Sequence, residues 1–444
     1  MSTLIYGLGE SGVAAIRALL DRGEPVTAAD ANDSDGLRET LKKLGVEGRL
    51  GAGPEALEGA GRVVVSPGIR PRDAVLLAAG ERGIPVLSEV ALGLELLGPG
   101  VRTIAVTGTN GKTTVVDMIR TILEKAGIRH AVAGNSWRAM TGCLDEIQRA
   151  GLLVLEVSSF QLHYMNEPGF EVAALLNARP DHLNWHASFE EYVADKLRVF
   201  EGQGHDDLAL VSAVDPVGRD AADEFAAEAL VVGEGDTEIR DGRLFLRGAE
   251  IASEDEMRFA GVHNHENALF AAAAAEWVGA SLEDIRAGLL GYRLKPHRME
   301  IVAERGGVLF VDDSKATNPA AVAATLSSFY RPVILILGGS EKHTDFAEVL
   351  PLLDRCRAVV CQGEAGPRIF DYLRERWDGA VIVTSELSEA VEEADRLARS
   401  GDVVLLSPGC ASFDQFPGYE ERGRAFTRYV SGEFVAGHAS ERRG

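Results

Sequence analysis

The chain has 444 residues, of which 46% are hydrophobic and 25% charged; this composition excludes global disorder, and the length predicts about three domains. Its 68 acidic and 45 basic side chains give a formal net charge of −23, which argues against nucleic acid as a partner. The four cysteines form no CxxC pair and no zinc-type cluster, so a disulfide framework and a structural zinc site are both disfavoured.

The N-terminal segment and the length of the apolar runs bear on where the protein resides. Met1–Glu10 has neither the basic flank nor the apolar stretch of an export signal, and no run of about 18 apolar residues occurs in the chain. We therefore expect a cytoplasmic protein without membrane insertion.

Short apolar runs typical of buried strands alternate with segments of helical period along the whole chain. Such runs include Thr3–Tyr6, Thr103–Thr107, Leu152–Val157 and Val308–Val311. They predict an α/β fold with mostly parallel sheets, whose ligands lie at the carboxyl ends of the strands. Glycine- and proline-containing joints at 97–100 and 291–296 divide the chain into three expected domains, at residues 1–97, 98–294 and 295–444.

The first glycine-rich motif follows the strand Thr3–Tyr6. It reads Gly7-Leu8-Gly9-Glu10-Ser11-Gly12, opens a helix, and is followed by Asp30 at the end of the next strand. This spacing is the dinucleotide fingerprint, in which glycines let the backbone approach a pyrophosphate and the acid holds a ribose hydroxyl or a base edge. The alternative is a tight turn between strand and helix that binds no ligand.

A second glycine-rich loop, at residues 106–114, follows the strand Thr103–Thr107 and precedes another helix. The common GxxxxGK[ST] pattern needs glycine at position 106, where this chain has valine. The chemistry of a phosphate loop is nevertheless present, because backbone N–H groups around Gly108 and Gly111 can surround phosphate, Lys112 adds a positive charge, and Thr113 offers a hydroxyl to Mg²⁺. A chance turn is the alternative.

Two strand ends in the middle of the chain carry possible metal ligands. Glu156 ends an apolar strand close to the phosphate loop in the predicted sheet, where a Mg²⁺ ligand is expected, although it can also be a neighbour of a helix N-cap. His182 lies in a turn at residues 177–186 and can bind metal or phosphate, or serve only the structure of the turn.

Three further polar residues lie on predicted helices. Lys196 looks like an ordinary helix lysine. Asn264 and Asn267 are three residues apart near a helix start, so both amides can face one ligand, although capping of the helix explains them equally well.

The last third of the chain repeats polar and basic clusters at strand ends. They lie at residues 295–300, 312–319, 337–342 and 406–412. Because the carboxyl ends of parallel strands meet at one edge of a sheet, we interpret the four clusters together as one anion-binding crevice.

Taken together, these motifs closely resemble those of the Mur ligases, ATP-dependent amide ligases of peptidoglycan synthesis. The resemblance covers essentially the whole chain and includes GTNGKTT, EVSSFQL, PDHLNWH, DDSKATN, GGSEKHTDF and SPGCASFDQFPGYEERG. It implies a Rossmann-like first domain for the UDP end of the substrate, a central P-loop-type domain for ATP, and a Rossmann-like third domain that closes over both with the amino acid.

The resemblance also implies roles for individual residues on the ATP side. Lys112, His182 and Lys196 are expected to be catalytic, and Lys196 to be carbamylated, which replaces the interpretation of an ordinary lysine. Two Mg²⁺ sites are expected to use Thr113, Glu156, His182 and Lys196. The expected ATP contacts are Gly108, Thr109, Asn110, Gly111, Lys112, Thr113, Thr114, Asn264, Asn267, Arg298, Asp313 and Lys315.

For the other substrates, the last three motifs are similar to the branch of the family that joins D-glutamate to UDP-N-acetylmuramoyl-L-alanine through an acyl phosphate. The expected contacts to the UDP substrate are Gly9, Ser11, Asp30, Ser66 and Asn135, and those to the amino acid are Thr317, Lys342, Ser412 and Tyr419. A monomer is expected.

The chain departs from the family pattern at two places. Ser136-Trp137 stands where a small glycine-containing turn is usual, and Asn184 stands where aspartate is common. Four other functions compete with the expected one: a sister ligase for another amino acid, a folylpolyglutamate-type ligase, an NAD-dependent oxidoreductase and a non-catalytic P-loop switch. A panel of amino acids tested for phosphate release from ATP separates them.

Overall fold

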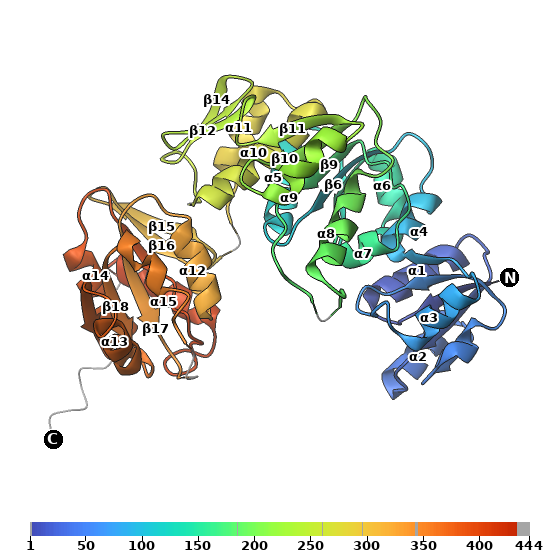
Figure 1. Cartoon of the computed structure of the whole chain (residues 1–444), viewed down its shortest axis with the longest axis horizontal. Helices are drawn as coiled ribbons and strands as arrows, with labels where there is room; N and C mark the ends of the chain where they lie inside the picture. Colours follow the sequence, from blue (N-terminus) through green and yellow to red (C-terminus); the bar gives the residue numbers. More distant parts are fainter. Residues whose placement is uncertain (1, 184, 260, 295, 342–344, 433–444) are drawn as a thin grey trace. The chain divides into compact units, whose positions relative to one another are not determined.

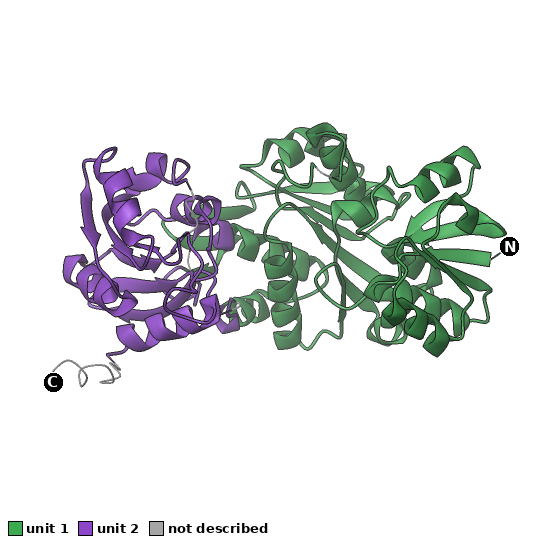
Figure 2. Cartoon of the chain, turned by 90° about the horizontal axis from the view of Figure 1, so that it is seen from below, with its two compact units in different colours: residues 1–253, 266–289 green, residues 254–265, 290–444 purple. Residues whose placement is uncertain are grey.

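The computed structural model describes residues 2–183, 185–259, 261–294, 296–341 and 345–432. The chain divides into two compact units, residues 1–253 with 266–289 and residues 254–265 with 290–444 (Figure 2). Among the described residues, no helix combines the length and the apolar character needed to cross a bilayer.

A five-stranded parallel sheet forms the N-terminal part of the first unit (Figure 1, blue). The strand order reverses around the central strand β1, because β2 and β3 lie on one side of it and β4 and β5 on the other. In sheet order the strands are β3 (Gly48–Leu50), β2 (Val26–Asp30), β1 (Ser2–Tyr6), β4 (Ala60–Val65) and β5 (Val86–Ser88), and the helices are α1 (Glu10–Leu20), α2 (Asp35–Leu44), α3 (Ala74–Glu81) and α4 (Glu89–Leu96).

A six-stranded parallel sheet follows in the same unit, and its order reverses at β6. All five residues of β8 are buried, as expected for a strand with both faces covered. The strands are, in sheet order, β11 (Glu228–Val232), β10 (Leu208–Ser212), β9 (Val172–Leu175), β6 (Arg102–Thr107), β8 (Leu152–Glu156) and β7 (Ala131–Gly134), and the helices are α5 (Lys112–Lys125), α6 (Leu144–Ala150), α7 (Ser159–His163), α8 (Phe189–Leu197) and α9 (Pro216–Ala221).

A small antiparallel sheet and two helices complete the central region. The sheet consists of β12 (Thr237–Arg240), β13 (Arg243–Leu246) and β14 (Ala249–Ser253), and the helices are α10 (Val262–Trp277) and α11 (Leu282–Gly291). The alanine run in α10 is buried, so this helix packs closely.

The second unit contains a six-stranded sheet that is parallel except for its edge strand β15 (Figure 1, orange and red). In sheet order the strands are β15 (Glu300–Arg305), β16 (Val308–Asp312), β20 (Val403–Leu406), β17 (Val333–Gly338), β18 (Cys356–Gln362) and β19 (Ala380–Val383), and the helices are α12 (Pro319–Ser327), α13 (Gly366–Arg374), α14 (Leu387–Leu397) and α15 (Tyr419–Val430). The predicted α/β fold class is therefore confirmed, while the domain limits at 97/98 and 294/295 stay predictions.

Helix α4 shows how the first two sheets join. Its Val90 and Ala91 belong to the hydrophobic core of the central sheet, whereas Leu92 belongs to a core of the N-terminal sheet. Glu89, at the first turn of α4, is 1% exposed and accepts hydrogen bonds from the backbone N–H and the hydroxyl of Thr141, at 2.6 and 2.5 Å. This buried carboxylate and the shared apolar contacts hold the two sheets in one unit.

Candidate active site

The phosphate loop lies where the order of the central sheet reverses, after β6. In open α/β sheets this reversal leaves a crevice in which ligands bind. Gly108 and Gly111 have φ values of 155° and 88°, conformations that L side chains rarely adopt. Lys112 is the first residue of α5, so the loop delivers its backbone N–H groups and this lysine to one helix N-terminus.

The loop is anchored from the neighbouring strand β9. Asn177 lies just after β9. Its backbone carbonyl accepts from the backbone N–H of Thr109 at 2.9 Å, and its side-chain oxygen accepts from the backbone N–H of Asn110 at 2.9 Å. The hydroxyls of Thr109 and Tyr192 lie 2.9 Å apart. The loop conformation is thus fixed by the protein itself.

Lys112 folds back over this loop. Its Nζ donates to the carbonyl oxygens of Gly108 and Thr109, at 2.7 and 3.1 Å. Burial lowers the pKa of Lys112, although Glu156 and Asp181 act in the opposite direction.

Glu156 ends β8 beside the loop and is fully buried. Its carboxylate accepts hydrogen bonds from Asn135, Ser136 and Trp137, three consecutive residues of the turn after β7. Thr113 donates to Ser136 Oγ at 3.3 Å, so the two predicted metal ligands Thr113 and Glu156 lie on either side of one serine hydroxyl. Hydroxyl and carboxylate oxygens are the ligands that Mg²⁺ prefers, so this donor set fits the ion.

Lys196 lies on α8 and is 1% exposed. Its ammonium lies 4.6 Å from the ring centroid of Tyr192, and it forms no ion pair with any residue that the structure describes. Burial, and secondly repulsion from Lys112, lower the pKa of Lys196 to about 6, while Asp181 raises it. At neutral pH Lys196 is therefore largely an uncharged amine.

His182 differs from Lys196 in being half exposed. It adopts a left-handed backbone conformation with φ of 53°, and its ring packs edge-on against Phe160 with centroids 4.9 Å apart. The turn thus presents His182 toward solvent while holding its ring in place.

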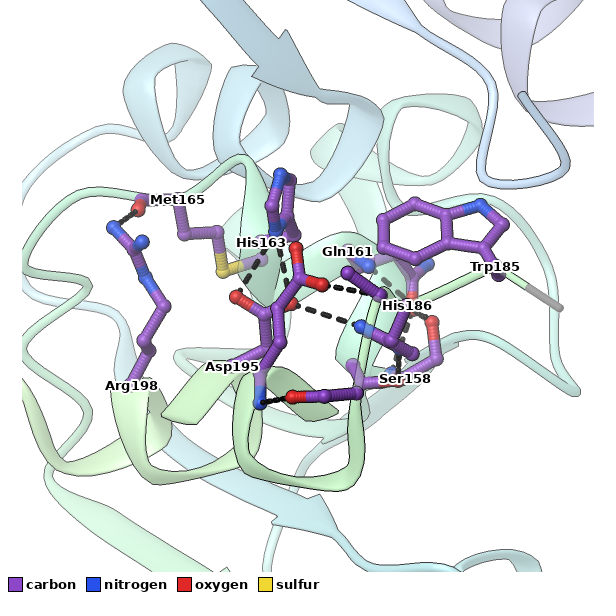
Figure 3. Close-up of polar contacts among 12 residues, drawn as sticks. Ser158, Gln161, His163, Met165, Trp185, His186, Asp195 and Arg198 are labelled. Carbon is purple, nitrogen blue, oxygen red and sulfur yellow. Dashed lines mark hydrogen bonds and ion pairs between the residues drawn. The ribbon is translucent and has the colours of Figure 1, made fainter. Parts of the chain in front are cut away.

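A histidine–aspartate network ties α8 to the surrounding segments (Figure 3). Asp195 accepts from His163 Nδ1 at 2.8 Å and lies 3.2 Å from His186 Nδ1, and His186 Nε2 is 3.0 Å from Ser159 Oγ. Burial lowers the pKa of His186. Because Asp195 precedes Lys196, the network holds the helix that carries this lysine against α7 and His186.

A cavity of about 630 Å³ lies at the carboxyl ends of β1 and β4 in the first unit. Its size suits a small-molecule ligand. The predicted substrate residues Gly9, Asp30 and Ser66 line it, whereas Ser11, on α1, is not among its lining residues. Trp185 and His186 from the central region complete the wall.

The glycine fingerprint beside this cavity is built as its spacing predicts. A Cβ on Gly12 would lie 2.0 Å from the carbonyl oxygen of Gly7, so only glycine permits the close packing of α1 on β1. Asp30 accepts from the backbone N–H of Leu8 at 2.9 Å, and Ser66 donates to the carbonyl of Gly7 at 2.9 Å. The acid therefore also braces the glycine turn.

The two predicted amides on α10 are both buried, Asn264 at 4% exposure and Asn267 at 7%. A Cβ on Gly111 would lie 2.7 Å from Asn267 Oδ1, which places this amide directly against the phosphate loop.

In the second unit, the predicted strand-end clusters meet at one edge of the sheet. β16, β20 and β17 are neighbouring parallel strands, and Asp313 after β16 accepts from the hydroxyls of Thr325 and of Ser407 after β20, at 2.7 and 3.0 Å. Burial raises the pKa of Asp313 to about 6, against the effect of these two hydrogen bonds.

The remaining predicted residues of this unit differ in exposure. The Lys315 ammonium lies 4.0 Å from the Tyr419 ring centroid. Thr317 is half-buried, Ser412 is 2% exposed, and Arg298 is exposed. Lys342 lies outside the described residues, as does Asn184.

Several structural contributors were missed by the sequence analysis. Tyr192 contacts both Thr109 and Lys196, and Asn177 holds the phosphate loop. Arg422, 1% exposed, donates to the carbonyls of Ser314 and Cys410 and thereby joins two strand-end loops. A polar residue directly after a buried strand was a usable signal for Asn177, whereas nothing in the local pattern distinguishes Arg422 from other helix arginines.

Comparison with family models matches three consecutive parts of the chain. Residues 1–88 match the Mur ligase MurD-like N-terminal domain, residues 106–275 the Mur ligase middle domain, and residues 297–410 the Mur ligase glutamate ligase domain.

Individual proteins agree with these matches. A UDP-N-acetylmuramoylalanine--D-glutamate ligase of Rubrobacter xylanophilus is 70% identical over 97% of this chain and 98% of its own length, and one of Syntrophus aciditrophicus is 39% identical over 96% and 97%. A solved structure of a UDP-N-acetylmuramoyl-L-alanyl-D-glutamate--2,6-diaminopimelate ligase has a TM-score of 0.57 at 19% identity, over 91% of this chain and 92% of that one, and so shares the fold. The chain belongs to the Mur ligase family, as the sequence motifs indicated.

Proposed function

We propose that this protein joins D-glutamate to UDP-N-acetylmuramoyl-L-alanine and converts ATP to ADP and phosphate in doing so, in the cytoplasm and as a monomer. The observation that most strongly supports this proposal is the phosphate loop at the point where the strand order of the central sheet reverses. Lys112, Thr113 and Glu156 lie in or beside this loop. The name of the 70% identical relative supports the choice of both substrates.

Lys112, Asn267 and the loop glycines form the ATP side of the proposed site, with Asn264 on the same helix. Backbone N–H groups at the start of α5 and the Lys112 ammonium oppose the negative charge that accumulates during phosphoryl transfer. Arg298, Asp313 and Lys315 are proposed as further nucleotide contacts.

Two Mg²⁺ sites are proposed, held by Thr113, Glu156, His182 and a modified Lys196. When bound, Mg²⁺ neutralises phosphate charge and orients the phosphoryl group for transfer. An unmodified lysine cannot serve as an anionic ligand, so this assignment requires that Lys196 change its charge.

Carbamylation supplies that change. The neutral Lys196 amine attacks the carbon of CO₂, a new N–C bond forms, and the displaced proton leaves to water, which gives a carboxylate-like group. The burial of Lys196 and its nearness to Lys112 support this proposal, because both disfavour an ammonium at this position.

The reaction follows from the need to activate a carboxylate. The terminal carboxylate of the L-alanine moiety attacks the γ-phosphorus of ATP, ADP leaves, and an acyl phosphate forms while Lys112 stabilises the phosphate charge. The amine of D-glutamate then attacks the acyl carbon, phosphate leaves, and the amine proton passes to solvent.

The UDP substrate is proposed to occupy the cavity lined by Gly9, Asp30 and Ser66, with Ser11 and Asn135 as further contacts. D-glutamate is proposed to bind Thr317, Ser412, Tyr419 and Lys342. A dicarboxylic amino acid needs cationic and hydroxyl partners for its charges, because an unpaired carboxylate in a closed site is costly, so neutral and basic side chains should be rejected.

Phosphate release from ATP, with and without UDP-N-acetylmuramoyl-L-alanine, tests the proposal when it is measured against a panel of amino acids. We expect release only with the UDP substrate, and fastest with D-glutamate. Faster release with L-lysine or diaminopimelate would assign a sister ligase, and release independent of any amino acid would assign a nucleotide switch.

A further inference from the structure

The turn after β7 is tied to the end of β8 by its backbone. Asn135 N–H donates to the carbonyl of Glu156 at 2.9 Å, and Trp137 N–H donates to the carbonyl of Gly134 at 2.9 Å. A Cβ on Gly134 would lie 2.0 Å from the Glu156 carbonyl oxygen, so only glycine lets the turn approach this closely. The turn is therefore fixed directly over Glu156.

Three side chains of this turn donate to the Glu156 carboxylate. Ser136 Oγ donates to Oε1 at 2.7 Å and Asn135 Nδ2 to the same oxygen at 3.0 Å, while Trp137 Nε1 donates to Oε2 at 3.1 Å. Both oxygens of the buried carboxylate thus have a fixed donor, which sets the rotation of the carboxylate plane. A turn of small residues in place of Ser136 and Trp137 would lack two of these three donors.

Ser136 has a second contact, with Thr113, the other predicted metal ligand. Thr113 Oγ1 donates to Ser136 Oγ at 3.3 Å, so one serine hydroxyl connects Thr113 on the phosphate loop with Glu156 on β8. Removal of this hydroxyl breaks the link between the threonine and the carboxylate and leaves Glu156 with two donors, Asn135 and Trp137.

We propose that Ser136 and Trp137 are positioning residues that hold Glu156 and Thr113 in the orientation required by Mg²⁺. The inference rests on the proposed function, since it assumes that these two residues bind the ion. Hydrogen bonds to metal-ligating carboxylates orient the ligand, and their loss typically reduces metal affinity by about 10–100-fold.

A purely structural role makes a different prediction. If Ser136 and Trp137 only satisfied a buried carboxylate, their removal would lower stability and leave the affinity of the folded enzyme for metal unchanged. Metal affinity therefore has to be measured directly, on the folded full-length chain.

Binding of Mn²⁺ to the ADP complex, followed through the electron paramagnetic resonance signal of free Mn²⁺, gives this affinity. Ser136→Ala and Trp137→Phe should each weaken Mn²⁺ binding by about tenfold. Ser136→Thr keeps the hydroxyl at an exposed position and should remain within about twofold of wild type. Trp277→Phe is the matched tryptophan control and should leave Mn²⁺ binding unchanged. ADP binding, measured without metal, should be the same in every variant as in wild type.

Tryptophan fluorescence provides a second readout. Mn²⁺ should quench the indole of Trp137 strongly because this ring contacts the carboxylate that binds the ion. Trp137→Phe should remove most of the quenching, and Trp277→Phe should retain it.

The inference is overturned if Ser136→Ala and Trp137→Phe both bind Mn²⁺ as tightly as wild type. Glu156→Gln separates that result from a failure of the proposed metal site. If Glu156→Gln weakens Mn²⁺ binding and the turn variants do not, only the positioning role falls. If Glu156→Gln also leaves binding unchanged, the site is wrongly placed and both proposals fall.

Discussion

Carbamylation of Lys196 should depend on the unusual acidity of this lysine. A lysine reacts with CO₂ only as the neutral amine, and an ordinary lysine with a pKa of 10.5 is about 0.1% neutral at pH 7.5. With a pKa of about 6, Lys196 is almost entirely neutral at the same pH. The structure therefore predicts that the fraction of neutral amine, the form that reacts with CO₂, is about a thousand times higher at Lys196 than at an exposed lysine.

The sign of the pH dependence follows from the direction of the shift. Because burial and Lys112 lower the pKa of Lys196, its amine stays available down to about pH 6 and is protonated below that value. At constant CO₂ pressure, carbamate should be present at pH 7.5 and should fall steeply below pH 6.

The assay is ¹³C nuclear magnetic resonance of the metal-free enzyme equilibrated with ¹³C-labelled CO₂ between pH 5 and pH 9. The carbamate signal should vanish in Lys196→Ala. It should persist in Lys125→Ala, which removes an exposed lysine at the end of α5. A signal that emerges only above about pH 9, where ordinary lysines begin to lose protons, or that survives in Lys196→Ala, would refute the reasoning.

Three further changes test other parts of the site. Lys112→Ala should slow phosphate release by at least about 10²–10³-fold, because it removes a charge from phosphoryl transfer, and Lys125→Ala should not; equal rates in the two variants would remove the phosphate-loop assignment. Asp195→Asn should lower thermal stability by about 1–3 kcal/mol and reduce carbamate occupancy, because it weakens the contacts that hold α8, and unchanged values of both would deny the network this role. Burial raises the pKa of Asp313, so its protonated form stabilises the fold. This contribution to the free energy of unfolding is at most about 3 kcal/mol; it is fully present below about pH 4 and is lost as the pH rises through about 6. Asp313→Asn should therefore gain stability relative to wild type between pH 4.5 and pH 7, and a difference in melting temperature that does not change with pH would contradict this.

Sequence patterns predicted the elements that carry the site because each motif is local. The strand, glycine loop and lysine around Lys112 lie within a dozen residues, and the apolar strand before Glu156 predicts a buried carboxylate at its end. The reversal of strand order that brings these two ends together is a property of the whole sheet, yet it follows from general rules for α/β folds.

Contacts between distant side chains could not be predicted in the same way. Nothing near Lys196 in the sequence shows that its helix is covered, and the family resemblance alone assigned it a role. In the sequence, Ser136 and Trp137 stand out only as a departure from the family pattern. Their donation to Glu156 depends on the left-handed conformation of Gly134 and on the pairing of β7 with β8, which only the folded chain specifies.

The central claim is that the enzyme activates a carboxylate by phosphorylation and then transfers the acyl group to D-glutamate. The direct measurement is the mass of the phosphate released when UDP-N-acetylmuramoyl-L-alanine carries ¹⁸O in its terminal carboxylate. The proposed mechanism predicts one ¹⁸O in each phosphate and one amide product for each ADP, only when D-glutamate is present. Unlabelled phosphate formed at the same rate as the amide product would contradict it.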